Sequence, residues 1–147
     1  MVLKSYAKIN LTLSVNKKLK SGLHNIQSIY CLIDLHDKIF LKKIKNKNLD
    51  QVSFTGPFSK DVNKSDNSVK KVLKVMRKNK IIHDYYSVKV NKKIPVFAGL
   101  GGGTGNAATL FNHFAKKKFN KKIFDEITKE VGSDFRLFSY NLGFQKD

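Results

Sequence analysis

The residues best suited to chemistry are five glycines between Gly99 and Gly105, in the stretch Pro95-Val-Phe-Ala-Gly-Leu-Gly-Gly-Gly-Thr-Gly-Asn-Ala-Ala108. A glycine backbone can take positive φ and approach a ligand closely. Apolar residues then recur near the 3.6 period, which predicts a helix that ends around Lys117. A glycine loop that leads into a helix N-terminus presents unpaired N–H groups and a positive dipole end. The stretch therefore predicts an anion site, and phosphate is the usual anion.

Two better-known phosphate loops do not fit this stretch. A Walker A loop ends in Gly-Lys followed by Ser or Thr, and no lysine stands at that place here. The dinucleotide pattern G-x-G-x-x-G fails because its last position is Thr104 from Gly99 and Asn106 from Gly101. A glycine-rich turn without a ligand is the alternative. We favour a phosphate site, because so many glycines lose conformational entropy on folding and such a costly loop rarely persists unless its backbone has a task.

The pattern Pro-x-x-Ala-Gly-Leu-Gly-Gly-Gly-Thr-x-Asn-Ala-Ala resembles the ATP-phosphate loop of the GHMP kinases. The resemblance implies ATP and Mg²⁺ as cofactors, with Thr104 near the metal or the β-phosphate. It also extends to a helix start at Asp66-Asn67 and to a lysine before the loop. The nucleotide-binding residues implied in this way are Pro95, Ala98, Gly99, Leu100, Gly101, Gly102, Gly103, Thr104, Gly105, Asn106, Asn67 and Lys92.

Two further motifs match the catalytic signatures of the same family. Ala7-Lys8-Ile9-Asn10-Leu11 resembles its N-terminal signature, and Gly132-Ser-Asp134 resembles the segment whose aspartate faces the catalytic lysine. The resemblance implies that Lys8 stabilises charge on the transferring phosphoryl group. Asp134 would accept the proton of the substrate hydroxyl or orient that hydroxyl. Without these motifs, Lys8 would be a solvated strand lysine and Asp134 a turn residue.

The resemblance also implies a substrate site. Gly22-Leu-His-Asn-Ile-Gln-Ser28 is similar to the family segment that holds a cytosine ring, although Leu23 stands where the family has an aromatic residue. The substrate-binding residues implied are Asn10, Leu23, His24 and Tyr30. In the branch of the family with three glycines after the leucine, the substrate is a cytidine diphosphate-linked methylerythritol, phosphorylated on its 2-hydroxyl. The reaction belongs to non-mevalonate isoprenoid biosynthesis.

Several elements must position these residues. Period-two alternation predicts a strand from Leu3 to Val15, with Lys8 and Asn10 side by side on its polar face. Further strands are expected at Ile26–Ile33 and Lys38–Ile44, joined by a turn at 34–37, and around 51–54 and 86–90. Asn67 and Asn120 are candidate caps of two more helices, at 68–76 and 121–131.

The fold class expected is α+β, a mostly antiparallel sheet with helices packed on one face. The resemblance implies a form like the second domain of ribosomal protein S5, with a left-handed β-α-β unit. It covers residues 1–147 as an ATP-binding N-terminal domain, and we expect the C-terminal domain of the family to be absent. The chain alone is then expected to be poorly active.

The composition is that of a globular protein, with 41% hydrophobic residues, one cysteine and no apolar stretch long enough to cross a bilayer. A cytoplasmic monomer or weak dimer is the simplest expectation. The net charge of +18 favours a nucleic-acid or ribosome-associated module as the rival interpretation. Only Arg77 and Arg136 are arginines, so we expect a small-molecule substrate and no specific nucleic acid. An inactive kinase fragment is a third possibility.

Overall fold

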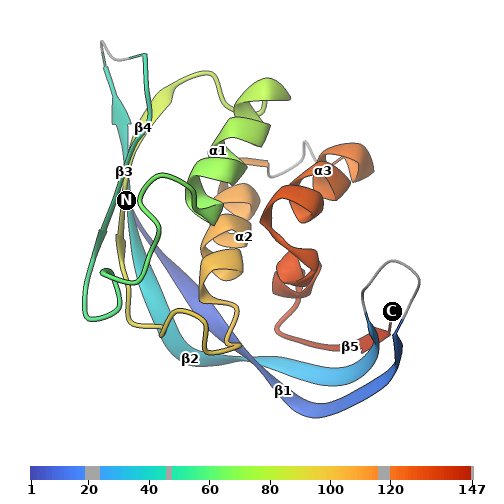
Figure 1. Cartoon of the computed structure of the whole chain (residues 1–147). Coiled ribbons are helices and arrows are strands. Elements are labelled where there is room, and N and C mark those ends of the chain that lie inside the picture. Colours follow the sequence, from blue (N-terminus) through green and yellow to red (C-terminus); the bar gives the residue numbers. More distant parts are fainter. Residues whose placement is uncertain (19–23, 46–47, 116–119, 147) are drawn as a thin grey trace.

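The computed structural model describes residues 1–18, 24–45, 48–115 and 120–146. Within them five strands form one sheet, and the helices lie on one face of it (Figure 1). The strands are β1 (Val2–Lys18), β2 (His24–Ile44), β3 (Gln51–Thr55), β4 (Tyr85–Asn91) and β5 (Leu142–Lys146). The helices are α1 (Ser68–Lys78), α2 (Gly102–Ala115), α3 (Lys121–Val131) and the 3-10 helix η1 (Ser133–Ser139). The predicted α+β class is confirmed.

The strand order is β1-β2-β4-β3, and β5 pairs with the N-terminal half of β2. All pairs are antiparallel except β3 with β4, which are parallel and joined through α1. The predicted β-α-β unit is therefore present, while its left hand stays a prediction. The described part of the chain contains no helix that is both long and apolar enough to cross a membrane.

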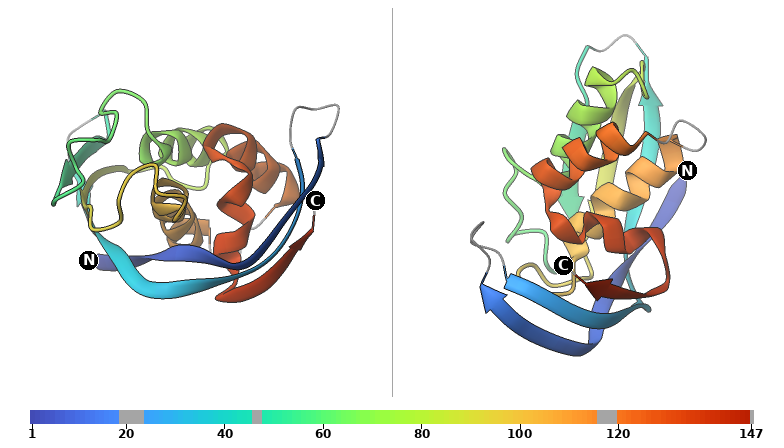
Figure 2. Two further views of the ribbon diagram at one scale, coloured as in Figure 1. Left: turned by 60° about the horizontal axis from the view of Figure 1, so that its bottom comes forward. Right: turned by 90° about the vertical axis from the view of Figure 1, so that its right-hand side faces the viewer.

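The prediction of two strands in the region 26–44 is wrong, because β2 is a single strand of 21 residues. Its register on β1 jumps from the pair Tyr6–His36 to the pair Ala7–Ile33. The extra residues between His36 and Ile33 are absorbed in a bulge, which bends a strand and increases its twist without ending it. The bulged stretch is polar, and residues 34–37 therefore resemble a turn in the sequence. The bend lets β1 and β2 curve below the helices (Figure 2).

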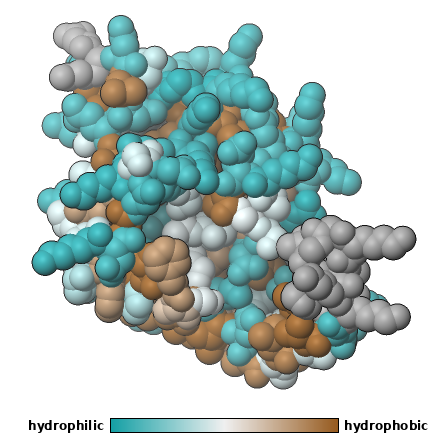
Figure 3. Space-filling model, viewed as in Figure 1, coloured by the Kyte–Doolittle hydropathy of each residue, from teal (hydrophilic) through white to brown (hydrophobic). Residues whose placement is uncertain are grey.

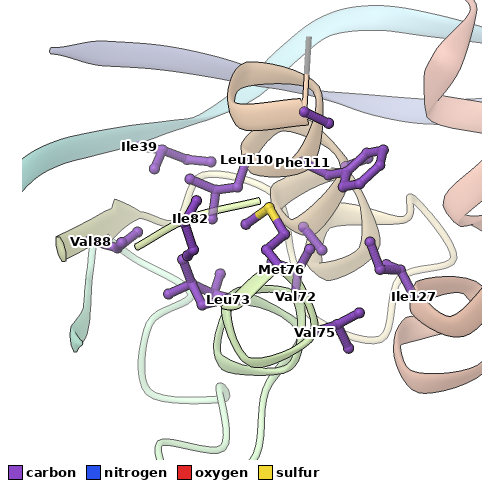
Figure 4. Packing of buried hydrophobic residues seen from close by; sticks show 14 of the residues in the cluster. Ile39, Val72, Leu73, Val75, Met76, Ile82, Val88, Leu110, Phe111 and Ile127 are labelled. Carbon is purple, nitrogen blue, oxygen red and sulfur yellow. The ribbon is translucent and has the colours of Figure 1, made fainter. Parts of the chain in front are cut away.

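The core lies between the sheet and the helices (Figure 4). Helix α1 begins where predicted: the Asn67 side chain accepts a hydrogen bond from the Lys70 backbone N–H at 3.0 Å, which satisfies one of the free donors of the first turn. The apolar stripe at the 3.6 period is then buried in this core. The largest fully buried side chains are Phe111, Phe135, Ile39, Leu73, Met76, Ile94, Leu110, Ile127, Val69, Val72, Val88 and Val90.

Helix α3 leads into the segment with Asp134. Asn120 caps it by accepting from the Lys122 N–H at 2.8 Å, and Ile127 is fully buried, as the predicted periodicity requires. Phe135 follows in η1 and packs on both neighbouring helices, with ring centroids 5.2 Å from Phe124 and 5.7 Å from Phe111. This aromatic cluster fixes where η1 starts, and so fixes the backbone around Asp134.

The far half of β1 departs from the expected alternation. Leu11, Leu13 and Val15 are each more than half exposed, so the apolar row of this strand is not covered by the described part of the chain. A second bulge lies between Asn10 and Thr12. Leu142 and Phe144 of β5, a strand that the sequence did not predict, are also mostly exposed. Hydrophobic side chains gather along this lower edge of the molecule (Figure 3).

Candidate active site

The glycine stretch divides into a loop and the first turns of a helix. Residues 95–100 are irregular, Gly99 and Gly101 have φ of 73° and 66°, and α2 already begins at Gly102. The predicted loop from Gly99 to Gly105 is thus shorter than expected, because Gly102, Gly103 and Gly105 are helical. A bond of the helical type runs from the Gly105 N–H to the Gly101 carbonyl at 2.7 Å. The N–H groups just before it lie at a helix N-terminus, the arrangement that binds anions.

Close packing explains why two of these positions are glycine. A Cβ on Gly101 would lie 2.6 Å from Cζ of Phe138, and the positive φ would strain any other residue. A Cβ on Gly102 would lie 2.8 Å from Cγ2 of Ile94 and 3.1 Å from Nζ of Lys92. The helix N-terminus is therefore seated directly on buried side chains, which holds its N–H groups in place.

A cavity of about 390 Å³ opens on this N-terminus. Most of the predicted nucleotide-binding residues line it: Asn67, Lys92, Pro95, Ala98, Gly99, Leu100, Gly101, Gly102, Gly103, Thr104 and Asn106. Gly105 does not, because it packs under Phe138 and against the Tyr6 carbonyl. Asn106 is 1% exposed, and its Oδ1 has no hydrogen-bond partner within the described residues. Asn106 is among the residues that line the cavity, and this acceptor atom is itself buried.

Lys8 and Asp134 come together beside the glycine loop. The Lys8 ammonium lies 3.4 Å from Oδ2 of Asp134 and donates to Oδ1 of Asn10 at 2.7 Å. The Lys8 backbone N–H donates to the Leu100 carbonyl at 2.9 Å, which ties β1 to the loop. Lys8 is only 3% exposed, whereas the side chain of Asp134 is 38% exposed. A buried cation is thus placed near a carboxylate that solvent or a substrate can reach.

Lys92, which the resemblance places near the nucleotide, lines the cavity with its ammonium already bound to a carboxylate. It is 2% exposed, and its ammonium donates to Oδ2 of Asp37, which is fully buried. The other oxygen of Asp37 accepts the backbone N–H groups of Lys93 at 2.7 Å and Ile94 at 2.9 Å. Asp37 on β2 therefore fixes the backbone that enters the glycine loop. Lys92 lines the cavity while it is paired with Asp37.

Of the predicted substrate residues, the structure describes the side chains of Asn10 and Tyr30, which lie in different surroundings. Asn10 is exposed and bound to Lys8. Tyr30 is 3% exposed and lies against Gly143 of β5. A Cβ added to Gly143 would lie 2.6 Å from the hydroxyl oxygen of Tyr30. Burial raises the pKa of the Tyr30 hydroxyl. His24 begins β2, and Leu23 lies outside the described residues. The structure thus places Tyr30 in a buried position against β5.

Sequence reasoning missed three residues that shape the site. Asp37 falls in a predicted turn, although it is the buried acceptor for the loop entrance. Phe138 forms the wall against Gly101. Ser68 donates from its hydroxyl to the Gly103 carbonyl at 2.6 Å, linking α1 to the start of α2. Asp-Lys pairs and hydroxyl-carbonyl bonds between distant segments leave no local pattern, so no signal in a single sequence could have found them.

The fold is that of the GHMP kinases. The structure matches a solved 4-(cytidine 5'-diphospho)-2C-methyl-D-erythritol kinase with a TM-score of 0.73 and 20% identity, covering 99% of this chain and 52% of that one. It matches mevalonate pyrophosphate decarboxylase from Streptococcus pyogenes with a TM-score of 0.64 and 14% identity, covering 99% and 47%. No family model matches the sequence. At these identities the likeness establishes the fold alone.

Sequence relatives narrow the class. The chain is 44% identical over 139 residues to the 4-diphosphocytidyl-2-C-methyl-D-erythritol kinase of Pelagibacter ubique, covering 92% of this chain and 48% of the relative. It is 33% identical over 141 residues to the relative of the same name from Ureaplasma parvum, covering 94% and 52%. A chloroplastic/chromoplastic relative from Solanum lycopersicum is also 33% identical. The chain spans about half the length of the curated bacterial relatives it matches, and its resemblance to this kinase is confirmed.

Proposed function

We propose that this chain is the ATP-binding N-terminal domain of a kinase that phosphorylates the 2-hydroxyl of 4-diphosphocytidyl-2-C-methyl-D-erythritol, in non-mevalonate isoprenoid biosynthesis. The observation that carries the proposal is the approach of Lys8 to Asp134, 3.4 Å apart, beside the glycine loop. These side chains lie far apart in the sequence and meet beside the glycine loop, to which the Lys8 backbone is hydrogen-bonded. The names of the curated relatives support the substrate.

The residues of the site have distinct roles in this proposal. N–H groups at the start of α2 bind the β- and γ-phosphates, and the buried Lys8 ammonium stabilises charge that develops on the transferring group. Asp134, more exposed, orients the acceptor hydroxyl or takes its proton. Phosphoryl transfer has a loose transition state, so positioning and charge stabilisation supply most of the catalysis.

Mg²⁺ fits this site as a partner of the nucleotide. Among the described residues no three His, Cys, Asp or Glu side chains gather into a metal cage. Mg²⁺ at kinase sites is held largely by substrate phosphates and water, with only one or two protein ligands. The hydroxyl of Thr104, at the N-terminal end of α2 and in the cavity wall, is the ligand we propose. The ion would neutralise charge on the phosphates when it is bound.

Calorimetric titration of the chain with Mg·ATP and Mg·GTP tests the nucleotide part of the proposal. We expect weak binding of Mg·ATP, because the proposed phosphate contacts are local to this chain, whereas the contacts to adenine and substrate are incomplete. Lys8→Ala should change this affinity little, since Lys8 acts on the transferring group. The absence of binding of either nucleotide at millimolar concentrations would refute the proposal and favour an inactive fragment.

A further inference from the structure

The sheet has a second face that the kinase chemistry does not use. The helices cover one side, and the other side is open (Figure 2). On this open sheet face, Phe40 of β2 stands between Val2 of β1 and Lys89 of β4, which are its paired neighbours. Phe40 is 40% exposed and Val2 is 56% exposed, while the alternate residues Ile39 and Val88 are fully buried. A large aromatic ring is therefore presented to solvent.

Four lysines surround this ring. Lys38 and Lys42 stand two positions before and after Phe40, Lys89 is opposite, and Lys4 is paired with Lys38. Diagonal neighbours on a sheet face are about 7–8 Å apart, so all four ammonium groups can reach a ligand that lies over Phe40. Tyr6 and His36 extend the surface along β1 and β2, in edge contact with ring centroids 5.5 Å apart.

The charge of these lysines is not compensated within the described part of the chain. None of the side chains of Lys4, Lys38, Lys42 and Lys89 has a hydrogen bond or ion pair to a described residue, whereas Lys43 pairs with Asp84 and Lys78 with Glu126. The carboxylate of Asp34 lies at the edge of this surface, 3.2 Å from Nδ1 of His36, and it contacts none of the four lysines. Asp37, on β2, is turned into the core and bound to Lys92.

We propose that the open sheet face binds single-stranded nucleic acid without sequence preference, with a base stacked on Phe40 and phosphates on the four lysines. Aromatic rings inside a positively charged surface are the usual platform for single strands, because every base has a flat face. The sheet curves around the helices, so the open face is convex and does not follow the backbone of a duplex. Phe40 and Val2 together present too little apolar area for insertion into a membrane.

Fluorescence anisotropy with a labelled oligothymidine of about 12 nucleotides tests the proposal, since single-strand sites span roughly 4–16 nucleotides. Phe40→Leu keeps an apolar side chain but removes the ring, and we expect about tenfold weaker binding. The double variant Lys42→Gln/Lys89→Gln removes two of the four lysines. Each phosphate that a lysine no longer neutralises should make the slope of log affinity against log salt shallower by roughly 0.7, so we expect a change of about 1.4.

The matched control is Lys74→Gln/Lys129→Gln, which removes the same charge from α1 and α3 on the other layer. These two lysines are exposed, and their side chains pair with no carboxylate of the described residues, so the control should leave the salt slope unchanged. Equal changes in both double variants would show attraction to the total charge and overturn the proposal. Binding that Phe40→Leu does not weaken, equal or tighter binding of a duplex, or no binding would also overturn it. Circular dichroism and the Mg·ATP titration report whether each variant is folded.

Discussion

The buried pair of Asp37 and Lys92 gives the sharpest test of how the loop is held. Asp37→Asn keeps an oxygen that can accept the Lys93 and Ile94 N–H groups, but it leaves the Lys92 ammonium buried without a counter-charge. Removing one member of a buried ion pair typically costs about 3–5 kcal/mol. Because small domains are stable by only about 5–15 kcal/mol, this single change should be visible in urea unfolding as a large shift in midpoint.

The double variant Asp37→Asn/Lys92→Met separates pairing from mere burial. A methionine at 92 removes the stranded charge, so the double variant should recover part of the stability that Asp37→Asn loses. Mg·ATP binding should be weakened in the double variant, since it removes a positive charge from the cavity lining. If Asp37→Asn lowers the free energy of unfolding by less than about 1 kcal/mol, or if the double variant is less stable than Asp37→Asn, the reasoning fails.

Two further results are expected. Gly101→Ala should lose about 1–3 kcal/mol more stability than Gly99→Ala, because both glycines have positive φ but only at Gly101 would a Cβ collide with Phe138. Urea unfolding midpoints of the two variants, with Mg·ATP titrations, check this prediction. Equal losses of stability would contradict it. The hydrogen bond from Lys78, with a second from Asn79, lowers the pKa of Glu126, so this carboxylate stabilises the fold at neutral pH and loses that contribution as the pH falls through its lowered pKa. Glu126→Gln should therefore lower the thermal midpoint slightly at pH 7 and make it less dependent on pH below the ordinary glutamate range; an unchanged pH profile would contradict this.

Much of the fold follows from local patterns. Asn67 and Asn120 are predicted caps, and both accept the expected backbone hydrogen bonds. The strand at Gln51–Thr55 and the helix after the glycines are also predictable, because each has its own periodicity or breaker residues. These features depend on residues a few positions apart, which is the range that sequence periodicity reports.

The failures concern long-range contacts. The bulge in β2 could not be told from a turn, because Asp34 and Asp37 favour turns in isolation. The burial of Lys8 depends on η1 and the loop packing over it, and the core position of Tyr30 depends on Gly143, more than 100 positions away (143 minus 30). The juxtaposition of Lys8 and Asp134 is expected only from the family resemblance. Neither residue type, nor their spacing, predicts that contact.

The central claim is that Lys8 and Asp134 form a phosphoryl-transfer site at the start of α2. The most direct measurement is transfer from labelled ATP to 4-diphosphocytidyl-2-C-methyl-D-erythritol, for this chain alone and with the C-terminal domain of a curated relative fused to it. We predict transfer by the fusion and little by the chain alone, since positioning of both reactants contributes roughly 7–11 kcal/mol to such reactions. Lys8→Ala and Asp134→Asn should each abolish that transfer with little loss of Mg·ATP affinity. Transfer that survives both substitutions would contradict the account.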